Sequence, residues 1–168
     1  MWTKLNWVEG PWQGKLAISA RPRGGDWLSD EISHWQQGGI DTVFSLLTRQ
    51  EEHDLNLDNE GTEVTAHGMN FLSFPIPDRE VPDSERSLAG ALEELEEELS
   101  RGRNVALHCR QGIGRSGLIA AGVLVTSGIP PDRAIDLVSS VRGRIIPETP
   151  DQRLWLQRLN FEQPVVTH

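Results

Sequence analysis

Apolar and polar positions follow two different periods along this chain, and the two periods predict strands and helices in turn. Short apolar runs typical of buried strands occur at 15–20, 41–47, 70–76 and 104–109. Longer segments with apolar residues three or four positions apart predict helices at 26–39, 84–101, 116–127, 130–143 and from about 150 onward. Strands that alternate with helices favour an α/β fold in which a mostly parallel central sheet is flanked by helices.

The first of these helices has an apolar face and a defined end. We expect its core-facing residues to be Trp27, Leu28, Ile32 and Trp35, and the pair Gly38-Gly39 to end it. Three further tryptophans, Trp2, Trp7 and Trp12, recur every five residues, which is neither the helix nor the strand period. They are expected to pack the N-terminal segment onto the domain.

The segment 84–101 contains many glutamates, but its leucines have helical order. Leu88, Leu92, Leu95 and Leu99 fall on one face, and the glutamates mostly cover the rest as a solvated surface. The segment 48–68 contains "LDNEGTE" and is the most irregular part of the chain. We expect it to be a loop excursion.

Size and charge limit the possible functions. The 168 residues suit one domain, expected to span residues 1–168, and the net charge of −9 argues against nucleic-acid and anionic-membrane surfaces. No stretch has the length of a signal peptide or approaches the roughly 20 apolar residues of a membrane span. A single cysteine allows no internal disulfide, so we expect a cytoplasmic protein, and a monomer.

The lone cysteine lies in "HCRQGIGRS", residues 108–116, where a predicted strand passes into a predicted helix. A loop that enters a helix N-terminus directs backbone N–H groups at one point and forms an anion site. Gly112 and Gly114 supply the backbone freedom for such a loop. The same field favours the thiolate of Cys109, and the planar guanidinium of Arg115 can hold two phosphate oxygens.

This segment therefore combines a nucleophile with a phosphate cradle, and it predicts phosphoryl transfer through a phosphocysteine. The phosphate-binding residues would be Arg110, Gln111, Gly112, Ile113, Gly114 and Arg115. The alternative is a buried structural cysteine beside a helix cap, which the spacing Cys-x5-Arg-Ser disfavours. A nucleotide-binding loop is excluded because no Gly-Lys-Ser/Thr follows.

A proton donor is needed for the leaving oxygen, and Asp78 in "PIPDREVPD" is the candidate because it follows a strand in a proline-bounded loop. Asp83 is the rival, but capping the helix that begins near Ser84 explains it. Thr149 and Gln152 have the spacing of a capping box. Ser116 can hydrogen-bond the departing thiolate, cap the helix, or do both.

The motif His-Cys-x5-Arg-Ser resembles the signature of the cysteine-dependent protein tyrosine phosphatase superfamily. "LNWVEGPWQGKLAISARP", "FPIPDREVPD" and "IIPETPDQ" are similar to segments of the small atypical dual-specificity phosphatases of the VHZ type. The resemblance implies one catalytic domain of the phosphatase fold and assigns Asp78 as the general acid. It implies that Gln152 orients the hydrolytic water, with Glu148 in the same motif, and that His108 orients the loop. Whether Gln152 is catalytic or only a helix cap stays open.

The resulting hypothesis is a phosphomonoesterase that hydrolyses phosphotyrosine, and phosphoserine or phosphothreonine, on a phosphoprotein or small aryl phosphate. The alternatives are a phosphate-binding module with weak or no turnover and another Cys-loop enzyme such as a rhodanese or arsenate reductase. The histidines outside the motif lack metal-ligand spacing, so we expect neither a metal nor another cofactor.

Overall fold

The computed structural model describes residues 2–77, 85–111, 114–142 and 150–162. Its strands are β1 (Asn6–Val8), β2 (Leu16–Ser19), β3 (Thr42–Ser45), β4 (Asn70–Ser73) and β5 (Val105–His108). Its helices are η1 (Gly25–Trp27), α1 (Leu28–Gln37), α2 (Arg49–Asp54), α3 (Glu60–Ala66), α4 (Glu85–Ser100), α5 (Gly114–Thr126), α6 (Pro131–Arg142) and α7 (Pro150–Glu162). The alternation of strands and helices confirms the predicted α/β class.

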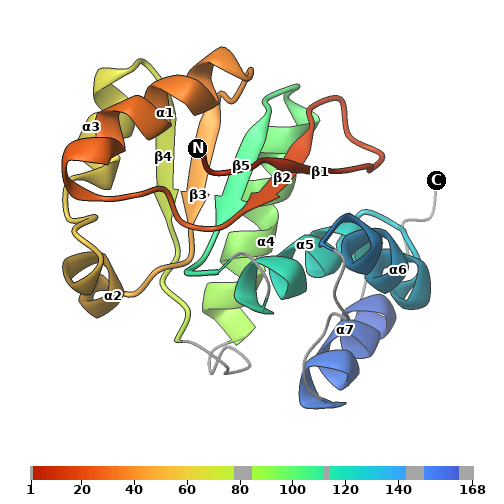
Figure 1. Cartoon of the computed structure of the whole chain (residues 1–168). Coiled ribbons are helices and arrows are strands. Elements are labelled where there is room, and N and C mark those ends of the chain that lie inside the picture. The colour runs from red at the N-terminus through yellow and green to blue at the C-terminus, as the bar shows by residue number, and fades with distance from the viewer. Residues whose placement is uncertain (1, 78–84, 112–113, 143–149, 163–168) are drawn as a thin grey trace.

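The strands form one sheet in the order β1-β2-β5-β3-β4, with β5 at its centre (Figure 1). Only the β1–β2 pair is antiparallel among the described strands. His108 on β5 is in register with Ser19 on β2 and with Ser45 on β3. The carboxyl ends of three parallel strands therefore meet at one edge, and Cys109 is the next residue at that edge.

Both faces of the sheet are buried, so the strands read as continuous apolar runs rather than as alternating ones. The larger core cluster lies under α4, α5, α6 and α7 and receives Leu16, Phe44 and Leu107. The smaller cluster lies under α1 and α3 and receives Ala17, Val43 and Ala106. Figure 1 shows these two helical layers on opposite sides of the sheet.

Most predicted helices are confirmed. In α4, Leu92, Leu95 and Leu99 are buried as predicted, whereas the side chain of Leu88 lies outside the described residues. Helix α5 begins at Gly114, two residues before the predicted start, and Pro131 opens α6 in the position expected for proline. Among the described residues, no helix combines the length and the apolar character that a membrane span requires.

The prediction that 48–68 is a loop is wrong, because α2 and α3 occupy most of it. Helix α2 is started by a capping box in which the Thr48 side chain accepts from the Glu51 N–H and the Glu51 side chain accepts from the Thr48 N–H. Helix α3 turns Val64 into the smaller core cluster. Both helices are too short and too polar to give a clear apolar period.

The prediction for Trp27 is also wrong. Its side chain is 56% exposed because the α-helix begins one residue later, at Leu28, and Trp27 ends the preceding 3-10 turn. The guanidinium of Arg23 lies 4.5 Å from the centre of the Trp27 ring and covers one face of it. Leu28, Ile32 and Trp35 are buried as predicted, and Gly38 caps the helix.

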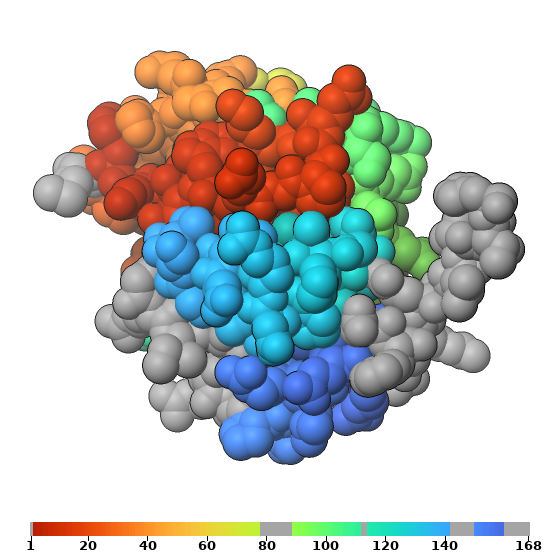
Figure 2. All heavy atoms as spheres, turned by 90° about the vertical axis from the view of Figure 1, so that its right-hand side faces the viewer, coloured from red at the N-terminus to blue at the C-terminus, as the bar shows by residue number. Residues whose placement is uncertain are grey.

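The N-terminal segment forms the edge strand β1, which the sequence pattern did not predict, and it packs against α6 (Figure 2). Trp12 packs against the larger core cluster and donates from Nε1 to the Ser127 hydroxyl at 2.8 Å. Trp2 and Trp7 are exposed by 45% and 39%, but the Trp2 ring stacks on His34 of α1 with 4.9 Å between the ring centres. Trp2 and Trp12 therefore pack the N-terminal segment onto the domain as predicted. A three-residue strand is too short to show a period.

Candidate functional site

The central strand β5 delivers Cys109 to the carboxyl edge of the sheet, where the chain turns toward α5. Cys109 is 2% exposed and belongs to the larger core cluster. Arg110 and Gln111 are exposed, and Gly114 begins the helix. Gly112 and Ile113 lie outside the described residues. The positive end of the 13-residue helix α5 thus begins a few residues beyond the thiol, which favours a bound anion and a thiolate.

The loop is fastened to the neighbouring strand ends. The Arg110 carbonyl accepts from the Arg21 N–H at 3.2 Å, and the His108 carbonyl accepts from the Leu46 N–H at 2.9 Å. These bonds join the segments that follow β2, β3 and β5. The backbone on both sides of Cys109 is therefore fixed by hydrogen bonds from the segments that follow β2 and β3.

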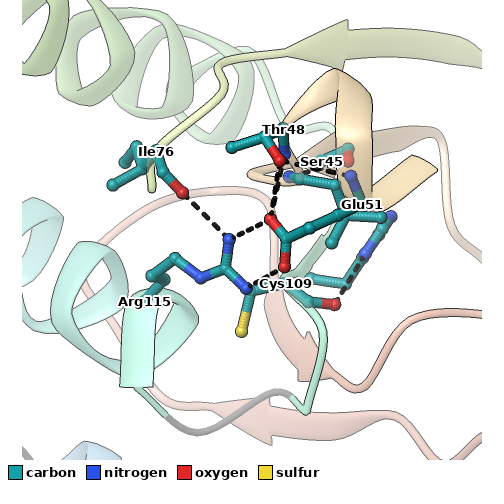
Figure 3. A network of polar contacts seen from close by, with 8 residues as sticks. Ser45, Thr48, Glu51, Ile76, Cys109 and Arg115 are labelled. Atoms are coloured by element: carbon teal, nitrogen blue, oxygen red, sulfur yellow. Dashed lines mark hydrogen bonds and ion pairs between the residues drawn. The ribbon is translucent and has the colours of Figure 1, made fainter. Parts of the chain in front are cut away.

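Arg115 is buried in the first turn of α5, and Glu51 and the Ile76 carbonyl hold its guanidinium (Figure 3). Nη1 donates to Glu51 Oε1 at 2.6 Å and to the Ile76 carbonyl at 2.9 Å, while Nη2 donates to Glu51 Oε2 at 2.8 Å. This two-point contact fixes the plane of the guanidinium as well as its position. The predicted phosphate-binding arginine is thus preorganised.

Glu51 is itself fixed at the start of α2 by the capping box with Thr48. Burial alone would raise the pKa of this carboxyl. The hydrogen bonds from Arg115 and Thr48, together with the positive charge of Arg115, outweigh burial and hold the pKa of Glu51 below its ordinary value. Glu51 is therefore a carboxylate at neutral pH, and Arg115 has a permanent counter-ion.

The second buried ion pair lies behind the cysteine. His108 and Glu60 are both completely buried, and His108 Nε2 lies 2.6 Å from Glu60 Oε2. On its other side the ring places Nδ1 3.2 Å from the Cys109 carbonyl oxygen. Burial would lower the pKa of His108, but the charge and hydrogen bond of Glu60 and the contacts with Cys109 raise it above its ordinary value.

Ser116 and Gln152, two polar residues predicted to lie at the site, are both buried. The Ser116 hydroxyl has no hydrogen-bond partner within the described part of the chain. Gln152 is 1% exposed in the first turn of α7, and α7 packs directly against α5. Thr149 and Glu148 lie outside the described residues, so the cap and the water-orienting roles of Gln152 are both still predictions.

Asp78, the predicted general acid, and its rival Asp83 also lie outside the described residues. The chain that leads toward Asp78 is nevertheless anchored at the site. Ile76 donates its N–H to the Leu46 carbonyl at 3.1 Å and accepts from Arg115 through its own carbonyl. No group of three or more metal-ligating side chains occurs among the residues that the structure describes.

Two residues of this site, Glu51 and Glu60, were missed by the sequence analysis because both fall in the segment taken for a loop. A signal for Glu51 was present in the spacing Thr48-x-x-Glu51, which is that of a capping box. Glu60 had no comparable signal, since a single glutamate in a polar segment predicts only solvent exposure. Its burial follows from the contact with His108, which is distant in the sequence.

A parallel sheet that brings a strand–Cys–loop–helix unit together with a buried arginine defines the class of cysteine-dependent phosphatase folds. Residues 19–129 match the family described as polymorphic toxin system, DSP-PTPase phosphatase. This match covers more than half of the chain, and the chain belongs to this family of dual-specificity-type protein tyrosine phosphatases.

Individual relatives agree with this assignment. Cyclin-dependent kinase inhibitor 3 of Rattus norvegicus is 36% identical over 118 residues, which are 69% of this chain and 55% of that protein. The chain thus spans about half the length of the curated relatives it matches. The solved structure of Tk-PTP in its active form is 28% identical with a TM-score of 0.77, covering 96% of this chain and 99% of that one.

The fold is closer still to that of kinase associated phosphatase with a serine in place of the catalytic-site cysteine. The TM-score is 0.86 at 24% identity, with 96% of each chain covered. This likeness covers nearly the whole chain and confirms the phosphatase fold expected from the sequence.

Proposed function

We propose that the chain is a phosphomonoesterase that hydrolyses phosphotyrosine, and phosphoserine or phosphothreonine, through a phosphocysteine. The observation that carries the proposal is the arrangement of Arg115, which is locked by Glu51 and the Ile76 carbonyl in the first turn of the helix that follows Cys109. A rigid cation and a helix N-terminus stabilise the charge of a transferring phosphoryl group without reorganisation during the reaction.

The proposed reaction has two steps. In the first, the Cys109 thiolate attacks phosphorus, the bond from phosphorus to the leaving oxygen breaks, and Asp78 gives its proton to that oxygen. In the second, water attacks phosphorus, Asp78 takes a proton from the water, and the sulfur–phosphorus bond breaks. Inorganic phosphate is released and the thiolate is restored, with Ser116 proposed to hydrogen-bond the departing sulfur and Gln152 to orient the water.

The proposed substrate is a phosphoprotein side chain or a small aryl phosphate. The net charge of −9 disfavours polyanionic partners such as nucleic acid and anionic membranes, and the protein is proposed to act as a monomer. A cytoplasmic location is proposed because a nucleophilic thiol must stay reduced to function.

The pH dependence of kcat/KM tests this mechanism. The first step needs Cys109 ionised and Asp78 protonated at once, so the profile for an aryl phosphate is expected to be bell-shaped with an acidic optimum. Asp78→Asn is expected to lower the rate and to remove the decline on the alkaline side. A parent rate that keeps rising to alkaline pH contradicts the assignment of Asp78.

The same preparation separates the alternatives. A phosphate-binding module would bind inorganic phosphate without releasing it from an aryl phosphate. A rhodanese would transfer sulfur from thiosulfate to cyanide, and an arsenate reductase would reduce arsenate. The proposed function requires phosphate release and none of these other activities.

A further inference from the structure

A buried glutamate faces the histidine that precedes the cysteine, and nothing in the two-step reaction yet uses it. Glu60 comes from the first turn of α3, on the side of the sheet away from α5, and is 0% exposed. Its Oε2 contacts His108, and its Oε1 has no hydrogen-bond partner among the described residues. Burying a carboxylate of which only one oxygen is hydrogen-bonded costs free energy of folding unless a positive charge lies beside it.

The contacts of the two ring nitrogens of His108 point to this residue as the source of the positive charge. Nδ1 faces the carbonyl oxygen of Cys109, which can only accept, and Nε2 faces a carboxylate oxygen of Glu60. A ring that donates from both nitrogens is an imidazolium. An imidazolium at this position would bridge Glu60 and the backbone of Cys109, with its positive charge between the carboxylate and the cysteine.

We propose that Glu60 is a positioning residue that keeps His108 as an imidazolium and, through it, stabilises the Cys109 thiolate and fixes the Cys109 carbonyl. The inference rests on the proposed function in which that thiolate is the nucleophile. Glu60 touches neither the thiol nor the phosphate site in this account. Its effect reaches the reaction only through the ring of His108.

Other charged groups near Glu60 and His108 also act on the charge of the histidine ring, but they do not take the place of Glu60. Helix α2 contributes Glu52, whose pKa is raised by burial and by repulsion from Glu60 and Asp58, while attraction by Arg49 and His108 opposes the rise. Helix α2 also contributes Glu51, but its charge is matched by Arg115 of α5. On the side of α1 the neighbour is the uncharged ring of Trp35, 6.0 Å from the His108 ring. Among the described neighbours, Glu60 is thus the anion hydrogen-bonded to His108.

The test is the pH dependence of Cys109 alkylation by iodoacetamide, which reports the thiolate and does not require phosphatase activity. In Glu60→Gln the amide carries no charge, so His108 is expected to lose its proton. The pH at which the alkylation rate is half-maximal is then expected to rise by about 1 pH unit, and this pH is called the midpoint below. The matched control is Glu98→Gln, another buried glutamate, which bonds Thr42 and Arg103 at the opposite end of the sheet. Its midpoint is expected to equal that of the parent.

A double-mutant cycle tests whether the effect passes through the histidine. His108→Gln is expected to raise the midpoint by itself, and adding Glu60→Gln to it is expected to cause no further rise. A Glu60→Gln midpoint equal to the parent value overturns the proposal, and so does a full second shift in the double variant.

One measurement on the unaltered protein covers the case in which Glu60→Gln does not fold. The ¹⁵N resonances of the His108 ring are expected to show two N–H groups at neutral pH, and a neutral tautomer overturns the proposal. The outcomes for the inference and for the proposed function are distinct. A parent that alkylates as predicted but releases no phosphate ends the proposed function alone, whereas an active parent with an unshifted Glu60→Gln ends this inference alone.

Discussion

Arg115 and Glu51 form a two-point ion pair, with Nη1 2.6 Å from Oε1 and Nη2 2.8 Å from Oε2. The residues are 64 positions apart in the sequence and belong to different helices, α5 and α2. The pair joins the start of a polar helix to the first turn of an apolar one. Because the two residues come from distant parts of the chain, the guanidinium has this orientation only when the tertiary fold has formed.

Removing the charge of Glu51 is expected to lower phosphatase activity. Gln at position 51 can still complete the capping box with Thr48, so helix α2 should start as before, but the charge-assisted contacts to Arg115 are lost. For Glu51→Gln we expect kcat/KM for an aryl phosphate to fall by about tenfold or more. Steady-state kinetics at fixed pH measure this.

The control for this variant is Glu97→Gln, which removes an exposed glutamate on α4 whose partner is Arg101, the residue that follows this helix. Its kcat/KM should match that of the parent, because exposed ion pairs contribute little. If Glu51→Gln were more active than the parent, Glu51 would compete with phosphate for Arg115 and would not position it.

The same ion pair predicts a loss of stability in acid. The pKa of Glu51 is lower in the folded protein than in the unfolded chain. The pair therefore stabilises the fold above the unfolded-state pKa, and this stabilisation is lost as the pH falls through the folded-state pKa. Thermal unfolding of the parent and of Glu51→Gln should give a Tm difference in favour of the parent at about pH 7 that shrinks toward about pH 4. A constant difference would contradict the linkage.

Ser116 is expected to act in the second step of the reaction. Its buried hydroxyl has no partner among the described residues, and a departing thiolate would supply one. Ser116→Ala should slow breakdown of the phosphocysteine by about tenfold or more while leaving its formation nearly unchanged. Rapid mixing with an aryl phosphate should then show a burst of the aryl alcohol followed by a slow steady state. Ser140→Ala, at an exposed position on α6, should behave as the parent, and a Ser116→Ala variant without a burst would refute the role.

Two glycines give opposite predictions for stability. A Cβ at Gly14 would overlap the backbone carbonyl of Arg103, whereas a Cβ at Gly90 in α4 would meet nothing within 4 Å. Gly14→Ala should therefore lower the free energy of unfolding by about 1–3 kcal/mol, and Gly90→Ala should raise it by about 0.5–1 kcal/mol. Urea unfolding checks both, and equal effects at the two positions would contradict the packing around Gly14.

The elements that the sequence predicted well are those whose signal is local. Strand β5 is a continuous apolar run because helices cover both faces of the sheet, and Cys109 and Arg115 lie in one short motif directly after it. In such cases the pattern alone places both the strand and the candidate nucleophile.

The parts that were missed depend on contacts between distant segments. Glu51 and Glu60 lie on short polar helices without an apolar stripe. The partial burial of Glu51 and the full burial of Glu60 are explained only by their contacts with Arg115 and His108. The prediction that Trp27 faces the core was wrong because the local pattern was followed one residue too far. An apolar residue next to an apolar helix face was taken as part of it, although the α-helix begins one residue later and Arg23 covers the ring.

The most direct test of the whole account is the release of phosphate from an aryl phosphate by the parent and by Cys109→Ser, prepared alike and assayed without added metal. Turnover is expected in the parent and none in the serine variant, because a serine hydroxyl at this position is not ionised and cannot replace the thiolate. Turnover that survives in Cys109→Ser would contradict the account by placing the chemistry elsewhere. A parent that is inactive with its thiol reduced would make the site a phosphate-binding one.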